Sequence, residues 1–195
     1  MTRQRGDDGA GDAGAGVAPG AAPGDATTGE GPVLAERLLA ALLGRRWTVG
    51  TAESLTGGLV SAALVSVPGA SAVLRGGVVA YATDLKGSVL GVPGPLLAAR
   101  GAVDPDVAHA MAAGVRRVLG TDVGLATTGV AGPGGQDGHA PGEVHVAVST
   151  PRGDEVRSLS LPGARAAVRA AAVAAVLGLA LEVVGEDGHG GAPRR

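Results

Sequence analysis

The fold is organised around the stretch TAESLTGG, residues 51–58, in which a strand-like run ends and a helical pattern begins. Ser54 therefore stands at a junction between a strand and a helix. The free N–H groups of a first helical turn point towards whatever such a serine hydroxyl contacts. One short segment can then supply a nucleophile and the donors that stabilise an oxyanion. The alternative is that Ser54 or Thr56 only caps the helix, which is the commoner use of these residues.

A second stretch, YATDLK at residues 81–86, holds the only tyrosine and the only lysine of a chain with 16 basic residues. Lysine can lose its proton when burial lowers its pKa, whereas arginine cannot. The pattern places Thr83 at the cap of a helix and Lys86 in its first turn, where the helix dipole lowers the pKa of an amine. Lys86 is therefore a candidate base for Ser54. The alternative is that the composition of the chain drifted towards arginine, and that Lys86 is a solvated lysine left unchanged by chance.

The two stretches together resemble the CinA carboxy-terminal domain family, also called the nicotinamide mononucleotide deamidase (PncC) family. That family has A-E-S-C-T-G-G and, 27 residues after its serine, Y-S-N-E-A-K, and the same separation joins Ser54 to Tyr81. The resemblance covers about residues 33–184. The chain departs from the family at Leu55, where cysteine is usual, and at residues 82–85. Neither departure removes a side chain that the implied mechanism needs.

The resemblance implies an amidohydrolase that converts nicotinamide mononucleotide to nicotinic acid mononucleotide and ammonia without a metal or cofactor. Ser54 would attack the carboxamide carbon after giving its proton to Lys86, and Tyr81 would steady the lysine or pass the proton to the departing amine. The oxyanion would be bound by N–H groups of three turn residues, Thr56, Gly57 and Gly58. The competing hypothesis is a nucleotide-binding module without catalysis, linked to competence or the response to DNA damage.

A glycine-rich stretch, TTGVAGPGG at residues 127–135, follows a predicted strand. It is not a dinucleotide fingerprint, because the next regular element is a strand and not a helix that could receive a pyrophosphate. Its N–H groups could form a nest for one phosphate, or the loop could be flexible and without a role. It is similar to the family's T-G-I-A-G-P, which lines the substrate pocket. The resemblance assigns that place to Thr128, Gly129, Ala131, Gly132 and Pro133.

Two arginines, Arg165 and Arg169, stand four apart at the start of the last predicted helix. They share one helix face and could grip a phosphate together, or both could be solvated. The stretch LPGAR, residues 161–165, resembles the family's F-x-G-D-R, whose arginine lies near the pocket. The resemblance therefore favours Arg165 over Arg169.

Three further side chains have open roles. Glu53 is buried by its strand context and could satisfy backbone N–H groups or orient Lys86. Glu143 and His145 share a strand face, but two ligands without a third predict ordinary surface and no metal site.

Composition separates a foldable region from its flanks. The chain has 195 residues and a net charge of −2. Residues 1–31 and 185–195 are rich in Gly, Ala, Pro and Asp without a hydrophobic period, which predicts disordered tails. Residues 32–184 are enough for one domain and too few for two. With one Trp, one Tyr and no Phe, the chain offers no aromatic or basic platform for nucleic acid.

Composition also suggests where the protein works. The chain has no cysteine, which excludes disulfides and thiolate metal sites. The longest uncharged helical run, residues 170–181, is shorter than the roughly 20 residues of a membrane span. We therefore expect a cytoplasmic protein with no membrane partner and a small-molecule nucleotide substrate, and the resemblance implies a homodimer.

Strand and helix patterns alternate along the chain. Strands are expected at residues 47–52, 77–81, 122–127, 143–149 and 155–161, the second of them buried on both faces. Helices are expected at residues 33–46, 58–67, 86–90, 95–100, 104–119 and 165–184, with Asp104 and Pro105 opening the fifth. This order predicts a single α/β domain, a mixed β-sheet with helices on both faces in three α/β/α layers.

Overall fold

The computed structural model describes residues 30–185, so most of the two predicted tails lies outside the described residues. The helices are α1 (Glu30–Arg45), α2 (Leu59–Val65), the 3-10 helix η1 (Ala70–Ala72), α3 (Thr83–Ser88), α4 (Gly94–Arg100), α5 (Pro105–Leu119) and α6 (Arg165–Val184). The strands are β1 (Val49–Glu53), β2 (Leu74–Val79), β3 (Val123–Gly129), β4 (Glu143–Thr150) and β5 (Gly153–Ser160). The helix α1 begins two residues before the predicted domain start.

Five strands form one mixed sheet in the order β2-β1-β3-β4-β5. Strand β1 runs parallel to both β2 and β3, whereas β4 is antiparallel to β3 and to β5. The chain leaves β1 towards β2 on one side and later returns to β3 on the other side. The carboxyl ends of β1 and β3 therefore meet at a topological switch point, which is where ligands bind in open α/β sheets.

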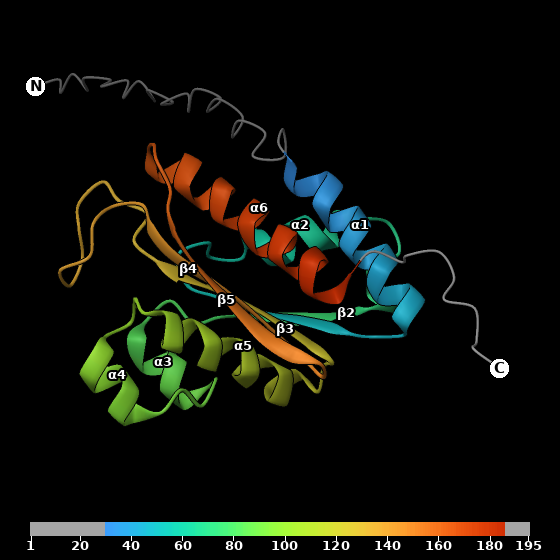
Figure 1. The fold of residues 1–195 in the computed structure, drawn as a ribbon, viewed down its shortest axis with the longest axis horizontal. Coiled ribbons are helices and arrows are strands. Elements are labelled where there is room, and N and C mark those ends of the chain that lie inside the picture. The colour runs from blue at the N-terminus through green and yellow to red at the C-terminus, as the bar shows by residue number, and fades with distance from the viewer. Residues whose placement is uncertain (1–29, 186–195) are drawn as a thin grey trace, which may run out of the picture.

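Helices cover both faces of the sheet, which confirms the predicted three-layer α/β architecture (Figure 1). On one face α1, α2 and α6 lie together over a large apolar cluster that includes Leu38, Leu42 and Leu177. On the other face α5 packs against the sheet through a second cluster centred on Val107 and Met111. The short helices α3 and α4 lie beside α5 (Figure 1).

The second strand differs from its prediction in both position and burial. It spans Leu74–Val79, and residues alternate between partly buried and exposed, so that Val79 is 47% exposed. The strand pairs only with β1 and forms an edge of the sheet. A strand buried on both faces was therefore the wrong expectation, because edge position is set by pairing with distant segments and not by local composition.

The last helix matches its prediction at both ends. Within the described part of the chain, α6 is the one helix long and apolar enough to cross a membrane by length and composition. Half of that apolar stretch is buried inside the protein. Residues such as Val168, Val176 and Ala180 are fully covered in the cluster shared with α1. Packing in the core thus accounts for the apolar sequence of α6.

Glycines let α5 lie directly on the sheet. A Cβ atom at Gly124 of β3 would clash with the backbone carbonyl oxygen of Ala112, and one at Gly114 of α5 would clash with the carbonyl oxygen of Leu90. Neither carbonyl can move without shifting its helix or turn. The position of α5 against β3 and against the segment that follows α3 depends on these two close approaches.

We therefore expect Gly124→Ala to lower the free energy of unfolding by about 2–3 kcal/mol, because the new methyl group forces α5 away from β3. Urea denaturation measures this change. The matched control is Gly178→Ala in α6, where no atom lies within 4 Å of the added Cβ. That substitution should raise stability by up to about 1 kcal/mol through helix propensity. Equal stability of the Gly124 variant and the parent would contradict the close approach.

Candidate active site

A buried lysine and a serine meet at the carboxyl end of β1. The Nζ atom of Lys86 lies 2.9 Å from Ser54 Oγ and donates a second hydrogen bond to the carbonyl oxygen of Ala80, at 3.0 Å. Lys86 is 1% exposed and Ser54 is 9% exposed. Within residues 30–185 no carboxylate lies within ion-pair distance of this amine. The predicted pair is therefore present, and its amine is buried without a carboxylate partner among the described residues.

Burial lowers the pKa of Lys86 from 10.5 to about 8, because the charged form loses its hydration. Ala82 caps α3, so Thr83 is the first helical residue and not the predicted cap. Lys86 then lies towards the end of this six-residue helix, where a dipole would favour the cation. The predicted direction of the pKa shift is thus right, but its cause is desolvation and not the helix dipole.

The ends of the parallel strands hold the pair in place. The N–H of Ser54 donates to the carbonyl oxygen of Thr127 on β3, which extends the ladder by one residue. The N–H of Ala80 donates to the carbonyl oxygen of Glu53 on β1. Ser54 is therefore fixed against β3, and the residue whose carbonyl binds Lys86 is fixed against β1.

Glu53 is a buried carboxylate, 1% exposed, that organises the start of α2. Its oxygens accept hydrogen bonds from the N–H groups of Gly58, Val60 and Ser61 at 2.8–3.0 Å. They also accept from the hydroxyl groups of Thr56 and Ser61. Of the two roles left open by the sequence, satisfying backbone N–H groups is the one observed, and no hydrogen bond joins Glu53 to Lys86 in the described region.

This arrangement changes which N–H groups are free to bind an oxyanion. Gly57 donates to the carbonyl oxygen of Ser54 at 3.1 Å, and Gly58 donates to Glu53. Their N–H groups are therefore not available as the predicted oxyanion donors. In residues 30–185 no partner is found for the N–H groups of Leu55 and Thr56. Of the predicted donors, only Thr56 keeps a free N–H group, and Leu55, directly after the serine, adds a second one.

A cavity of about 240 Å³ opens beside the pair. Eight predicted site residues line it: Ser54, Tyr81, Lys86, Thr128, Gly129, Ala131, Gly132 and Arg165. Four predicted residues, Thr56, Gly57, Gly58 and Pro133, are not among the residues that line it. The lining also includes Leu55, Val103 and Gln136, to which the sequence assigned no role. Gln136 directly follows the glycine-rich stretch, residues 127–135, which is the signal that could have identified it. Val103 comes from a loop that carries no recognisable motif.

Tyr81 and Arg165 form the outer part of the cavity. Arg165 donates to the Tyr81 hydroxyl oxygen at 3.1 Å and to the carbonyl oxygen of Gly132 at 3.2 Å. Tyr81 is 59% exposed, and in the described chain no hydrogen bond joins it to Lys86. The predicted contact of Tyr81 with the lysine is therefore absent, and its observed partner is Arg165. Arg165 places a cation at the cavity mouth.

The glycine-rich loop is folded back on β4. The N–H of Val130 donates to the carbonyl oxygen of Glu143, and the N–H of Gly142 donates to the carbonyl oxygen of Val130. No partner is found in residues 30–185 for the N–H groups of Ala131 and Gly132, both of which line the cavity. These two groups are the part of the predicted nest that remains open to a ligand.

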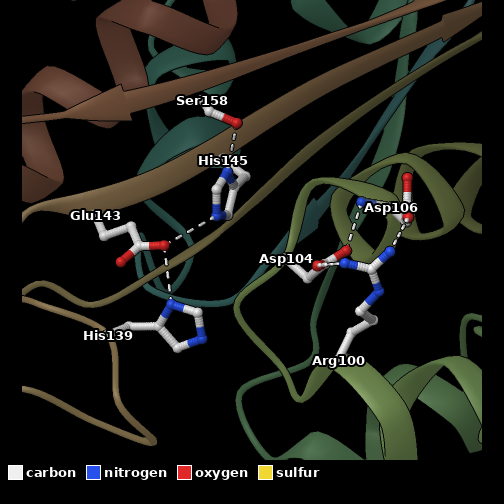
Figure 2. A network of polar contacts seen from close by, with 7 residues as sticks. All are labelled: Arg100, Asp104, Asp106, His139, Glu143, His145 and Ser158. Carbon is white, nitrogen blue, oxygen red and sulfur yellow. Dashed lines mark hydrogen bonds and ion pairs between the residues drawn. The ribbon is translucent and has the colours of Figure 1, made fainter.

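A polar cluster binds the end of the glycine-rich loop to the sheet (Figure 2). Glu143 Oε1 lies 2.8 Å from His139 Nδ1 and 3.6 Å from His145 Nε2, and His145 Nδ1 lies 2.9 Å from Ser158 Oγ. The hydrogen bond from His139 lowers the pKa of Glu143, and burial lowers the pKa of His145. Within the described residues, no group of three such side chains is arranged to hold a metal ion. The cluster joins the loop to β4 and β5.

Together these features define an α/β protein with a buried serine and lysine at the switch point of a mixed sheet. The CinA C-terminal domain family model matches residues 32–184. The chain therefore belongs to the CinA C-terminal domain family.

Relatives with curated names support this membership. A CinA-like protein of Frankia casuarinae is 51% identical over 142 residues, which are 73% of this chain and 33% of the relative. A putative competence-damage inducible protein of Desulforamulus reducens is 50% identical over 133 residues, 68% of this chain and 32% of the relative. The chain thus spans about a third of the length of these relatives.

Solved structures of similar length share the fold. The competence/damage inducible protein CihA from Agrobacterium tumefaciens superposes with a TM-score of 0.76 at 34% identity, covering 80% of this chain and 96% of that one. A CinA superfamily protein from Enterobacter cloacae gives a TM-score of 0.77 at 29% identity, covering 87% and 100%. The chain therefore covers nearly the whole length of both solved structures.

The buried lysine predicts a pH dependence of stability. Its pKa is about 8 in the folded protein and 10.5 in the unfolded chain, so the unfolded chain binds more protons between these values. The free energy of unfolding should therefore rise with pH between about 8 and 10.5, by about 3 kcal/mol if the whole pKa shift is expressed. This gain is lost again as the pH falls back to about 8. Urea denaturation of the parent and of Lys86→Met isolates the effect. A difference between the two proteins that is constant with pH would contradict it.

Proposed function

We propose that this protein is an amidohydrolase that converts nicotinamide mononucleotide to nicotinic acid mononucleotide and ammonia. The observation that carries the proposal is the Lys86 Nζ to Ser54 Oγ distance of 2.9 Å, with the lysine buried beside a cavity and no carboxylate of the described residues paired with it. A lysine with a pKa of about 8 is partly neutral near neutral pH. It can then act as a base, which an ordinary solvated lysine cannot do.

In the first half of the reaction, neutral Lys86 takes the proton of the Ser54 hydroxyl while Oγ attacks the carboxamide carbon. The carbonyl oxygen becomes an oxyanion, and the unpaired N–H groups of Leu55 and Thr56 are its proposed donors. The tetrahedral intermediate collapses as the C–N bond breaks. The protonated lysine gives its proton to the departing amide nitrogen, which leaves as ammonia and returns the lysine to its neutral state.

In the second half, water attacks the acyl-enzyme ester. Lys86 accepts a proton from this water, and its cation then protonates Ser54 Oγ as the ester C–O bond breaks. The carboxylic acid product loses its proton to solvent, and the free serine is restored. Both halves use the same lysine, which therefore has to exchange its proton easily. A pKa of about 8 suits this exchange better than the usual 10.5.

The nucleotide phosphate is proposed to bind near the cavity mouth. Arg165 provides a cation there, and the N–H groups of Ala131 and Gly132 have no partner among the described residues. Cation and N–H donors together recognise phosphate oxygens well. Tyr81 accepts a hydrogen bond from Arg165, so its proposed role is to position that guanidinium. No cofactor has a step in this scheme.

A nucleotide-binding module without catalysis is the second candidate. It is favoured by the name of the Desulforamulus reducens relative, which refers to competence and damage, and by the greater length of both relatives. A pure binding module, however, has no need for a buried lysine next to a serine. Burial of an amine without a carboxylate lowers stability, and catalysis gives that arrangement a use.

The direct test is release of ammonia from nicotinamide mononucleotide by the purified protein. We expect turnover whose kcat rises with pH and levels off above about 8. Ser54→Ala and Lys86→Arg should each lower kcat by at least about 1000-fold, the second because a guanidinium stays protonated. Tight binding of the nucleotide without ammonia release would instead establish the binding module.

Arg165→Ala tests the phosphate site. Loss of a contact made equally in the ground state and the transition state raises KM and leaves kcat nearly unchanged. We expect KM to rise by about 10-fold or more, since charge-assisted hydrogen bonds contribute about 1.5–3 kcal/mol. Arg157→Ala is the matched control, because Arg157 pairs with Glu182 on the surface and does not line the cavity. Unchanged KM in the Arg165 variant would remove this residue from the site.

A further inference from the structure

We propose that Arg169 is a positioning residue, which holds the turn after Ser54 in the orientation that the reaction requires. This inference rests on the proposed serine chemistry but not on the identity of the substrate. Arg169 does not line the catalytic cavity. It acts, in this proposal, only through the backbone of Leu55 and Thr56.

The closing hydrogen bond of the turn leaves its central peptide free of a direct constraint. Residues Ser54 to Gly57 form a four-residue turn that is closed by the Gly57 N–H bond to the Ser54 carbonyl oxygen. That bond does not fix the central peptide, between Leu55 and Thr56. Turns of types I and II share the same closing bond and differ in which way this central peptide faces. Type II also needs a positive φ at the third residue, which is unfavourable for the β-branched Thr56, and Thr56 does not adopt one. The turn therefore favours one orientation of this peptide, and a further contact can hold the peptide in that orientation.

Arg169 supplies such a contact from α6. Its Nε atom donates to the Leu55 carbonyl oxygen at 3.0 Å, and its Nη2 atom donates to the Thr56 carbonyl oxygen at 2.6 Å. In a planar trans peptide the C=O and the following N–H point in opposite directions. Fixing the Leu55 carbonyl towards Arg169 therefore fixes the Thr56 N–H on the opposite side. A flipped central peptide would turn this oxyanion donor towards α6.

Arginine is suited to this task and lysine is not. Two donors of one rigid planar group reach two successive carbonyls, whereas an ammonium is a single flexible point charge. Gly57 leaves room for the guanidinium, since a Cβ atom there would lie 3.4 Å from Arg169 Nη2. The helix that carries Arg169 is anchored by Val168 and Ala172, both fully buried in the core. The Arg169 side chain is therefore held at its helix by core packing and at its guanidinium by two hydrogen bonds.

The contacts also exclude the phosphate role that the sequence left open for Arg169. Two of its three nitrogens already bind backbone carbonyls. Arg165, one helical turn earlier, is the residue that reaches the cavity. The two arginines thus have different roles: loss of Arg165 should affect substrate binding, and loss of Arg169 should affect the chemical step.

The test compares Arg169→Ala and Arg169→Lys with the surface control Arg157→Ala in steady-state deamidation. Because loss of one oxyanion donor lowers kcat by about 100- to 1000-fold, we expect kcat to fall by about 100-fold in both Arg169 variants. KM should stay within about 2-fold, and the pH midpoint should not move, since Lys86 is untouched. Methylguanidinium should restore part of kcat to Arg169→Ala and none to Arg169→Lys. Lower kcat without rescue, in step with a lower folded fraction by circular dichroism, would overturn the proposal.

A probe that is independent of the nucleotide separates this inference from the proposed function. Phenylmethanesulfonyl fluoride reacts with an activated serine and loses fluoride, and intact mass reports the modification of Ser54. If the parent is labelled but does not deamidate the nucleotide, the substrate assignment fails while Arg169 is still tested. Labelling at least about 10-fold slower in both Arg169 variants than in Arg157→Ala supports the proposal. Equal labelling rates overturn it, and an unlabelled, inactive parent overturns both proposals together.

Discussion

The architecture depends on one unfavourable interaction, the burial of an amine without a counter-ion. Removing an ammonium from water is costly, and the protein reduces the cost by letting Lys86 lose its proton more easily, with a pKa of about 8. The N–H groups of the Lys86 amine donate hydrogen bonds to Ser54 Oγ and to the Ala80 carbonyl oxygen. Both partners come from the ends of neighbouring parallel strands. The mixed sheet, with β1 between β2 and β3, is what brings those ends together.

A buried carboxylate, that of Glu53, lies next to this site but does not pair with Lys86. Glu53 directly precedes Ser54, and a carboxylate so close could pair with Lys86, raise its pKa and remove the base. Instead the hydrogen bonds from Gly58, Val60, Ser61 and Thr56 engage both carboxylate oxygens. Those bonds also start α2. One residue thus organises the helix and leaves the lysine free of negative charge.

Sequence patterns identified the features that depend on local chemistry. The family, the α/β class and the bounds of α6 were predictable because short motifs and apolar periodicity determine them. The edge position of β2 was not, since Gly76 and Gly77 carry no side chains to show an alternating pattern. The free N–H groups of the turn could not be assigned either, because they depend on where Glu53 and Arg169 direct their hydrogen bonds. Such contacts join segments that are distant in the sequence.

The central claim is that desolvation makes the only lysine of the chain a base. Because there is one lysine, selective ¹³Cε-lysine labelling gives a single side-chain resonance, and its NMR titration measures this pKa directly in the free protein. The account predicts a midpoint near 8, and a shift to about 10.5 when the protein is unfolded in urea. A midpoint near 10.5 in the folded protein would show a charged lysine at neutral pH and would contradict the proposed base.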